Sequence, residues 1–154
     1  MKNDKGEIIS GIRQLKKPEY GTGKNNRFGQ PVVNWNYLSK YADDDGFDIR
    51  NIESNGKHTI EYILPYGSRI IRYGSEIGHF SSPKGTAYEE LSLPYIPESM
   101  EYNEYKVIAD NVRIVCVVDK GIVAPGFDSL GGAVQYLHPI TIREAVKKGM
   151  LERI

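Results

Sequence analysis

The fold class of this chain is decided by one stretch, residues 58–73, which reads HTIEYILPYGSRIIRY. Residues 58–63 alternate between polar and apolar side chains, as expected for a strand with one face toward a core. Residues 68–73 are rich in β-branched side chains and predict a second strand. The sequence PYG at 65–67 lies between them as a turn. We therefore expect the two strands to pair as a hairpin.

Further strands follow downstream. Residues 102–109 and 112–118 are apolar and β-branched enough for two strands, joined across Asp110-Asn111, which is an Asx-type turn pair. The glycine-rich stretch 126–132 leads into another strand at 134–136. Strands that follow one another with little helix between them predict an antiparallel sheet.

Two short helices are also expected. Thr86-x-x-Glu89 has the pattern of a capping box, in which two side chains satisfy the free amides at a helix start, and it predicts a helix that ends before Pro94. The same pattern at 141–144 predicts a C-terminal helix that Gly149 terminates. The predicted fold class is therefore α+β: a mainly antiparallel, twisted β-sheet with a few short helices, including a C-terminal one.

The chain divides by composition near residue 36. The first 36 residues show no sustained strand or helix period and carry two turn clusters, GTGKNN at 21–26 and FGQP at 28–31. We expect residues 1–36 to form an N-terminal arm or linker and residues 37–154 to form one domain. A single helical turn at 37–42 is expected near the start of that domain.

The charge balance argues against one class of partner. The 154 residues include 20 Lys and Arg and 20 Asp and Glu, so the formal net charge is zero at pH 7. A domain that grips phosphate backbones normally carries a basic surface, because neutralised phosphates supply most of that affinity. We therefore expect no nucleic-acid partner.

The single cysteine and the hydropathy limit the chemistry further. Because Cys116 is the only cysteine, there is no intrachain disulfide and no cysteine cluster for a metal ion. Cys116 lies in an apolar stretch and is expected to be a small buried hydrophobe. No apolar run approaches the roughly 20 residues of a membrane-spanning helix, and residues 1–9 do not form a signal peptide. We expect no metal site and no membrane span.

The common short catalytic motifs are absent: there is no nucleophile elbow, Walker loop, dinucleotide fingerprint or zinc-protease helix. The three histidines stand apart in the sequence. His58, on an alternating strand, is expected to be a surface residue, and His138, beside a proline, is expected to be a loop residue. His79 lies between a glycine and an aromatic residue, which suggests a ligand-facing loop, although a purely structural role stays open.

Two segments carry candidate functional residues. Arg72 ends a predicted strand, so a planar and permanently charged guanidinium stands where pairing stops and a loop begins. Gly131 and Gly132 let the backbone approach a ligand and shortly precede the neutral amide of Gln135. Alone, the arginine is also readable as a solvated strand-end charge, and the glycines as a β-bulge.

Several short pieces stand in one order between residues 45 and 136. They are DGF at 45–47, LPYG at 64–67, RYG at 72–74, GHFSSPKGT at 78–86, LP at 93–94, YNEY at 102–105, APGF at 124–127 and GGAVQY at 131–136. In this order they resemble the tuberculosis-necrotizing-toxin (TNT) domain, a family of NAD glycohydrolase toxin domains. The capped C-terminal helix and the following MLERI also resemble the chain ends of bacterial members.

The resemblance implies roles for individual residues. Arg72 matches the family's essential arginine and Gln135 its essential glutamine, so these two are the predicted catalytic residues. A second group is expected to shape the substrate pocket: Tyr73, Gly74, His79, Phe80, Ser82, Gly85, Thr86, Phe127, Gly131 and Gly132. The chain departs from the family pattern at three places, with Leu91-Ser92 for an arginine, Asn103 for a histidine of some members, and Ser129-Leu130 for Gln-Pro.

The implied activity is that of an NAD(P) glycohydrolase, which cleaves the nicotinamide–ribose bond of NAD or NADP as substrate and needs no cofactor. Nicotinamide leaves as a neutral base, so the enzyme must mainly hold the pyrophosphate and orient ribose and water. Arg72 supplies paired donors and Gln135 an orienting amide. The resemblance also implies the C-terminal part of a larger secreted or delivered toxin that acts in the target cytoplasm and binds a cognate immunity protein.

Other functions stay open from the residues alone. An ADP-ribosyltransferase uses the same substrate, although no Glu-x-Glu pair near a strand end supports an acceptor site. A catalytically impaired nucleotide-binding or partner-binding module is motivated by Leu91, Asn103 and Ala133. The sequence has no close Asp/Glu pair beside the matching loops, so it does not favour a two-carboxylate mechanism of the glycosidase kind. No single residue identifies a 2′-phosphate contact, so NAD and NADP are both open.

Overall fold

The computed structural model describes residues 20–25, 27, 31–34, 40–94 and 100–154. A seven-stranded sheet has the order β3-β7-β8-β5-β4-β6-β9, and all its pairings are antiparallel, as expected. The strands are β3 (Thr59–Ile63), β4 (Arg69–Tyr73), β5 (Phe80–Pro83), β6 (Tyr102–Val107), β7 (Val117–Ile122), β8 (Val134–Leu137) and β9 (Leu151–Arg153).

The hairpin expected between β3 and β4 is wrong. β3 pairs along its length with β7, whereas β4 pairs with β5 on one side and β6 on the other. The reason is that the backbone amides around the turn form their hydrogen bonds with residues far along the chain and not with each other's strand. The amide of Leu64 donates to the carbonyl of Cys116 at 2.9 Å, and the amide of Gly67 donates to that of Val107 at 2.7 Å. The turn therefore carries the chain from one half of the sheet to the other.

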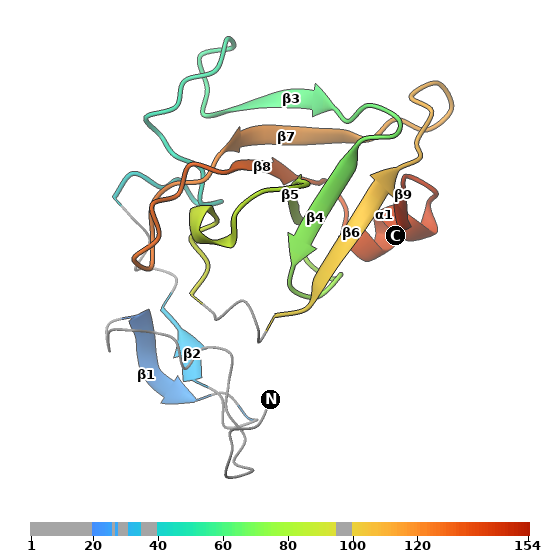
Figure 1. The fold of residues 1–154 in the computed structure, drawn as a ribbon. Helices are drawn as coiled ribbons and strands as arrows, with labels where there is room; N and C mark the ends of the chain where they lie inside the picture. Colours follow the sequence, from blue (N-terminus) through green and yellow to red (C-terminus); the bar gives the residue numbers. More distant parts are fainter. Residues whose placement is uncertain (1–19, 26, 28–30, 35–39, 95–99) are drawn as a thin grey trace.

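β5 joins the two halves of the sheet. It pairs with β8, where Phe80 lies opposite Leu137, and with β4, where Ser82 lies opposite Ile71. In Figure 1 β3 and β7 run across the upper part of the molecule, and β4 and β6 cross that direction steeply. The sheet is therefore strongly twisted at β5.

The strand expected at 112–118 begins later, at Val117. The carboxylate of Asp110 accepts the amide hydrogens of Val112 and Arg113, both at 2.9 Å. This is the Asx turn expected from the sequence. The loop that it forms is longer than expected, so the strand starts later.

The C-terminal helix is confirmed as α1 (Ile142–Lys147), which is the only α-helix within the described ranges. Thr141 and Glu144 form the reciprocal capping box, and Ile142 and Ala145 are fully buried. Gly149 follows with a φ of +76°, as expected for a helix stop. No helix in the described part of the chain is long and apolar enough to span a membrane.

The helix expected at Thr86 is reduced to one 3₁₀ turn, η4 (Tyr88–Glu90). The hydroxyl of Thr86 donates to the carbonyl of Pro83 at 2.7 Å, so it does not cap the turn. Helical structure is therefore scarcer than the α+β expectation implied.

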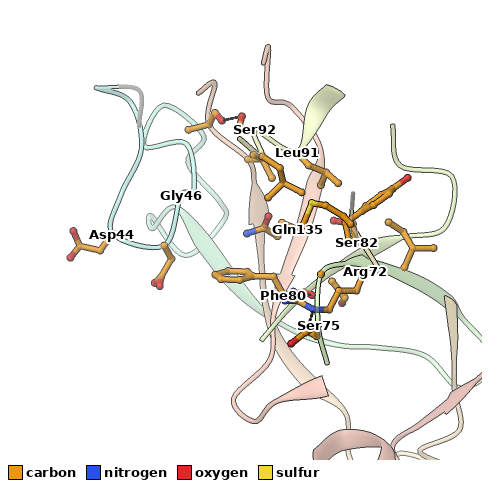
Figure 2. Close-up of a pocket in the computed structure, with 18 residues that line it drawn as sticks. Asp44, Gly46, Arg72, Ser75, Phe80, Ser82, Leu91, Ser92 and Gln135 are labelled. Atoms are coloured by element: carbon orange, nitrogen blue, oxygen red, sulfur yellow. Dashed lines mark hydrogen bonds between the residues drawn. The ribbon is translucent and has the colours of Figure 1, made fainter. Parts of the chain in front are cut away.

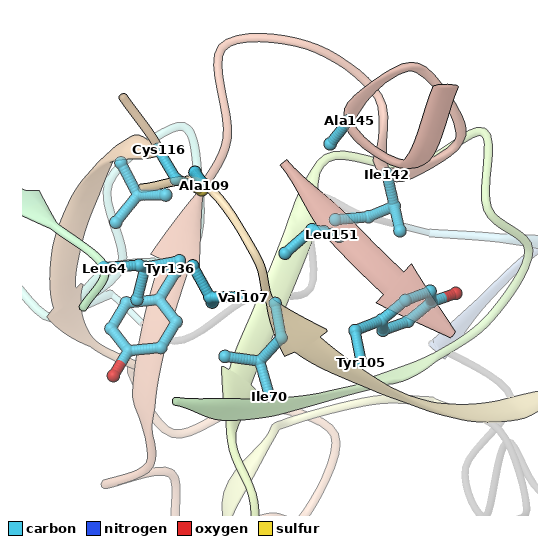
Figure 3. Packing of buried hydrophobic residues seen from close by; sticks show 11 residues of the cluster. Leu64, Ile70, Tyr105, Val107, Ala109, Cys116, Tyr136, Ile142, Ala145 and Leu151 are labelled. Carbon is cyan, nitrogen blue, oxygen red and sulfur yellow. The ribbon is translucent and has the colours of Figure 1, made fainter. Parts of the chain in front are cut away.

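The main core lies between the sheet and α1 (Figure 3). It is formed by Leu64, Ile70, Tyr105, Val107, Ala109, Cys116, Val118, Tyr136, Ile142, Ala145 and Leu151. Cys116 is buried as expected, and its burial raises the pKa of the thiol to about 11. A thiol with that pKa is a packing residue rather than a nucleophile.

The N-terminal segment contains a separate two-stranded sheet, β1 (Gly21–Asn25) and β2 (Pro31–Val33) (Figure 1). Tyr20 is 2% exposed, and its hydroxyl donates to Asp128 Oδ1 at 2.6 Å. The Tyr20 ring also meets the ring of Phe127 edge-on at 5.5 Å. This part of the predicted arm therefore packs on the following domain. Residues 37–39 of the helical turn expected at 37–42 lie outside the described residues, and residues 40–42 form no helix but a turn that ends in an isolated β-bridge between Ala42 and Asp48.

Candidate functional site

A cavity of about 640 Å³ lies beside β5, where the two halves of the sheet meet (Figure 2). This volume is within the usual range of small-molecule sites. Strands β4, β5 and β8 supply part of the wall, and loops near residues 45, 92 and 124 supply the rest.

Half of the predicted site residues line this cavity: Arg72, Tyr73, Gly74, Phe80, Ser82 and Gln135. The others are not part of the lining: His79, Gly85, Thr86, Phe127, Gly131 and Gly132. Arg72 and Gln135, which are far apart in the sequence, therefore face one space.

The guanidinium of Arg72 is fixed by backbone carbonyls. Its Nε donates to the carbonyl of Ser75 at 2.8 Å and its Nη1 to that of Phe80 at 2.9 Å. Its Nη2 lies against Gly78, where an added Cβ would stand 1.9 Å away. Burial lowers the pKa of Arg72, but an arginine remains charged at neutral pH. No ion pair joins Arg72 to a carboxylate of the described residues, so its charge is available to an anion.

The loop beneath this guanidinium is anchored from several elements. Arg153 of β9 makes two hydrogen bonds to the carboxylate of Glu76, one of them at 2.7 Å, and Tyr105 donates to the same group at 2.6 Å. The Arg153 guanidinium, together with the Tyr105 hydroxyl, lowers the pKa of Glu76 against the opposing effect of burial. At the start of α1, the amide of Ile142 donates to the carbonyl of Gly78 at 3.0 Å. The position of Arg72 is therefore set before any ligand arrives.

Gln135 lies on β8 opposite Gly121. Continued across the sheet, the register places Gln135, Ser82 and Ile71 on one face, and all three line the cavity. The side chains of Gln135 and Ser82 make no hydrogen bond to any described residue, although Ser82 is only 3% exposed. An amide and a hydroxyl are thus open to a ligand at the centre of the site.

His138 lies in the loop directly after β8, as expected, but it is 2% exposed and therefore buried. Its Nε2 lies 2.7 Å from the hydroxyl of Ser81, which lines the cavity. Burial lowers the pKa of His138 to about 4, with smaller contributions from Arg72 and His79. The imidazole is therefore neutral at pH 7. Its burial follows from the extension of β8, because its amide donates to the carbonyl of His79 at 2.8 Å.

The glycine pair expected to meet the ligand instead builds the wall behind it. Gly131 and Gly132 have φ values of +67° and +95°. A Cβ on Gly131 would stand 2.6 Å from the carbonyl oxygen of Val123, and the amide of Gly132 donates to that oxygen at 2.8 Å. Val123 itself lines the cavity. Gly131 is needed here for close backbone packing, whereas Gly132 has space for a Cβ and is favoured by its positive φ alone.

The remaining predicted residues lie away from the lining. His79 is exposed, with its Nδ1 3.2 Å from the carbonyl oxygen of His138. Gly85 and Thr86 form the turn after β5, and Phe127 packs against Tyr20.

Twelve lining residues were not among the predicted ones: Asp44, Asp45, Gly46, Ile71, Ser75, Ser81, Leu91, Ser92, Leu93, Met100, Val123 and Ala124. The sequence carried a signal for the first three, because Asp45 and Gly46 belong to the DGF piece and Asp44 directly precedes it. Leu91, one of the departures from the family pattern noted in the sequence, is buried with Val123 and Ala133. This part of the wall is therefore apolar.

No group of three or more His, Cys, Asp or Glu side chains in the described ranges could hold a metal ion. The chemistry that the visible site offers is anion binding by Arg72 and hydrogen bonding by Gln135 and Ser82.

Comparison with known proteins adds three findings. Residues 63–154 match the model of a family described as Tuberculosis necrotizing toxin. The chain is 31% identical over 100 residues to the conidial surface nicotinamide adenine dinucleotide glycohydrolase nadA of Aspergillus fumigatus. That match covers 59% of this chain and 40% of the fungal protein, so the chain spans less than half the length of this relative. The fold is similar to the structure of tuberculosis necrotizing toxin complexed with its immunity factor IFT, with a TM-score of 0.51, 18% identity, and coverage of 97% of this chain and 85% of that one.

Proposed function

Because the chain belongs to the tuberculosis necrotizing toxin family, we propose that it is an NAD(P) glycohydrolase. It hydrolyses the N-glycosidic bond between nicotinamide and ribose, and releases nicotinamide and ADP-ribose or its phosphate. The observation that carries this proposal is the shared cavity of Arg72 and Gln135, in which the guanidinium is fixed and has no carboxylate partner among the described residues. The name of the fungal relative, an NAD glycohydrolase, supports the same substrate.

Arg72 binds the pyrophosphate. Two of the five N–H donors of an arginine are taken by the carbonyls of Ser75 and Phe80, which leaves three for phosphate oxygens. Since those carbonyls set the orientation in advance, little side-chain entropy is lost when the anion binds.

Gln135 and Ser82 act at the ribose. When the C1′–N bond breaks, its electron pair goes to the ring nitrogen, so nicotinamide leaves as a neutral molecule and needs no general acid. Water then adds to the cationic C1′ and releases a proton to solvent. The amide of Gln135 and the hydroxyl of Ser82 orient the ribose and this water, which contributes to rate by positioning.

The test is a fluorescent assay of NAD⁺ consumption with the purified full chain. We expect turnover by the wild type and losses in kcat/KM of roughly a hundredfold or more for Arg72→Ala and Gln135→Ala. Arg69→Ala is a matched control, because Arg69 is exposed on the same strand and does not line the cavity. Full activity of Arg72→Ala would contradict the site, and no loss of NAD⁺ at micromolar wild type would contradict the enzyme.

A second candidate is a binding module with impaired catalysis. Leu91 favours it, because an apolar side chain occupies the wall where the family usually has an arginine. Calorimetry decides between the two, since NAD⁺ binding without turnover supports the module. Transfer of labelled ADP-ribose to a target protein would support a transferase instead.

We also propose that the chain is the toxin piece of a larger secreted or delivered protein that acts in the target cytoplasm. A cognate immunity protein would then block the cavity. The structure of tuberculosis necrotizing toxin is that of a complex with its immunity factor, which supports this partner class. Titration of a candidate immunity protein into the NAD⁺ assay should abolish turnover at a one-to-one ratio.

A further inference from the structure

The three consecutive aspartates at 43–45 have different environments. Asp43 Oδ1 accepts the amide hydrogens of Asp45 and Phe47, both at 2.9 Å, and so closes the turn. The side chains of Asp44 and Asp45 make no hydrogen bond or ion pair with any described residue, and both line the cavity. One carboxylate of the three is therefore structural, and the other two aspartates belong to the cavity wall without a side-chain partner among the described residues.

The loop that carries these carboxylates is firmly docked on the sheet. Phe47 is 1% exposed and packs on Gly121, where an added Cβ would stand 2.6 Å from the ring. The amide of Ala124 donates to the carbonyl of Gly46 at 2.9 Å. Asp45 directly precedes these two anchors, and its own amide donates to Asp43 Oδ1, so its backbone has a defined place in the cavity wall.

The acidic loop and the arginine stand on different sides of the cavity. In Figure 2, Asp44 and Gly46 lie at one side, Arg72 at the other, and Gln135 between them. The cavity thus has a positive wall and a negative wall with hydrogen-bonding groups in the middle. NAD⁺ has a matching charge order, with two negative charges on the pyrophosphate and one positive charge on the nicotinamide ring.

Two further observations bear on the ligand of this cavity. Ser82 is almost completely buried, lines the same cavity and has no hydrogen-bond partner among the described residues. Burial raises the pKa of Asp45, and the neighbouring carboxylates of Asp43, Asp44 and Asp119 raise it further. A bound cation would relieve this repulsion.

We propose that Asp45 is a specificity-determining residue that binds the positively charged nicotinamide ring of the oxidised dinucleotide. This inference rests on the proposed function, because it assigns one end of the same cavity. The ring becomes neutral when the glycosidic bond breaks, so its attraction to Asp45 ends with the reaction. The neutral ring of the reduced dinucleotide does not gain this attraction at all.

The experiment compares wild type with Asp45→Asn, Asp45→Glu and the control Asp119→Asn. Asp119 contributes to the field at Asp45 but does not line the cavity. We would measure the KM of NAD⁺ and the inhibition constants of NADH and ADP-ribose, with thermal unfolding as the check on folding. For Asp45→Asn we expect about a fivefold to tenfold rise in the KM of NAD⁺ at low salt, as for one charge pair at the edge of a solvated cavity. The inhibition constants should change less than about twofold, since neither inhibitor carries the cationic ring.

The outcomes separate this inference from the enzyme proposal. Asp45→Glu should restore most of the NAD⁺ affinity, and Asp119→Asn should behave as wild type. The inference is overturned if the constants for NAD⁺, NADH and ADP-ribose change together, as they would if Asp45 held the adenosine end, or if none changes. If the wild type binds NAD⁺ without cleaving it, the enzyme proposal fails, and dissociation constants of NAD⁺ and NADH for the same variants still test Asp45. Absence of NAD⁺ binding to the wild type overturns both.

Discussion

The two charged walls of the cavity are built in different ways. On one side, Arg72 is oriented by two carbonyls and rests on a loop that Glu76, Arg153 and α1 hold in place. On the other side, Asp44 and Asp45 are exposed, and only their backbone is fixed. The difference shows that the positive wall works by holding the Arg72 guanidinium in a fixed position. The negative wall works by long-range electrostatic attraction, which solvent and salt weaken. Substitutions that move Arg72 should therefore impair activity more than substitutions in the loop of Asp44 and Asp45.

The largest effect is expected for Gly78→Ala, which breaks the geometry of the positive wall. The new Cβ would stand 1.9 Å from Nη2 of Arg72, so the guanidinium must move. We expect kcat/KM for NAD⁺ to fall roughly a hundredfold to a thousandfold, with a small change in melting temperature. In a protein that already carries Arg72→Ala, Gly78→Ala should lower kcat/KM hardly any further, because the guanidinium that the new Cβ would displace is absent. If the losses in kcat/KM of the two single variants add in the double variant, Gly78 affects activity by a route other than the position of Arg72.

The second effect concerns His138, which supports Ser81 on the same wall. Burial lowers its pKa to about 4 in the folded protein, with smaller contributions from Arg72 and His79, whereas the pKa is about 6.5 in an unfolded chain. Below pH 6.5 the unfolded state therefore binds a proton that the folded state does not. We expect the free energy of unfolding to fall by up to about 3 kcal/mol between pH 6.5 and pH 4.

Urea unfolding over this pH range tests the prediction. His138→Asn should remove most of the slope, whereas His58→Asn, at a more exposed position, should keep it. A slope unchanged by His138→Asn would assign the acid sensitivity to other groups.

The third effect is expected for Glu76→Gln, which weakens the support of the Arg72 loop. Arg153 and Tyr105 hydrogen-bond to this carboxylate, and they lower its pKa. Its contribution to stability is therefore full above its unfolded pKa of about 4.3 and is lost as the pH falls through the folded value. We expect a loss of about 1–2 kcal/mol at pH 7, reduced because the Arg153 side chain is half exposed, and a smaller difference at pH 3.

Urea unfolding at both pH values, with Glu152→Gln as an exposed control on β9, checks this expectation. An equal loss at pH 7 and pH 3 would mean that the charge of Glu76 is not what stabilises the loop.

The smallest effect is expected for Asp44→Asn on the negative wall. Asp44 points outward at the edge of the cavity in Figure 2 and has no partner among the described side chains. We expect at most about a twofold rise in the KM of NAD⁺, which should vanish in 0.5 M salt. A loss as large as that of Gly78→Ala would abolish the distinction between the two walls.

Local sequence patterns succeeded where the interaction itself is local. The capping box of Thr141 and Glu144 was predictable because both partners lie within one helical turn. The Asx turn at Asp110 was predictable for the same reason. The same capping pattern failed at Thr86, where the hydroxyl found the carbonyl of Pro83 instead. A motif of four residues cannot exclude a competing acceptor just upstream.

Local sequence patterns could not predict which strands pair with each other. β3 and β4 are separated by a short turn, yet their partners come from residues 80–122, which no periodicity within the pair reveals. The burial of His138 and the roles of the glycines at 131 and 132 depend on the same long-range packing.

By itself, the sequence determined that the chain is a mainly antiparallel β protein and, through its ordered motifs, which family it resembles. It also indicated Arg72 and Gln135, because residue identity and order along the chain are local information. Only the tertiary structure decided that these two face one cavity, that Gly78 leaves room for the guanidinium, and that Asp44 and Asp45 line the same space. The physical reason is that a binding site is made of distances between residues far apart in the chain, and those distances exist only after the sheet has paired and twisted.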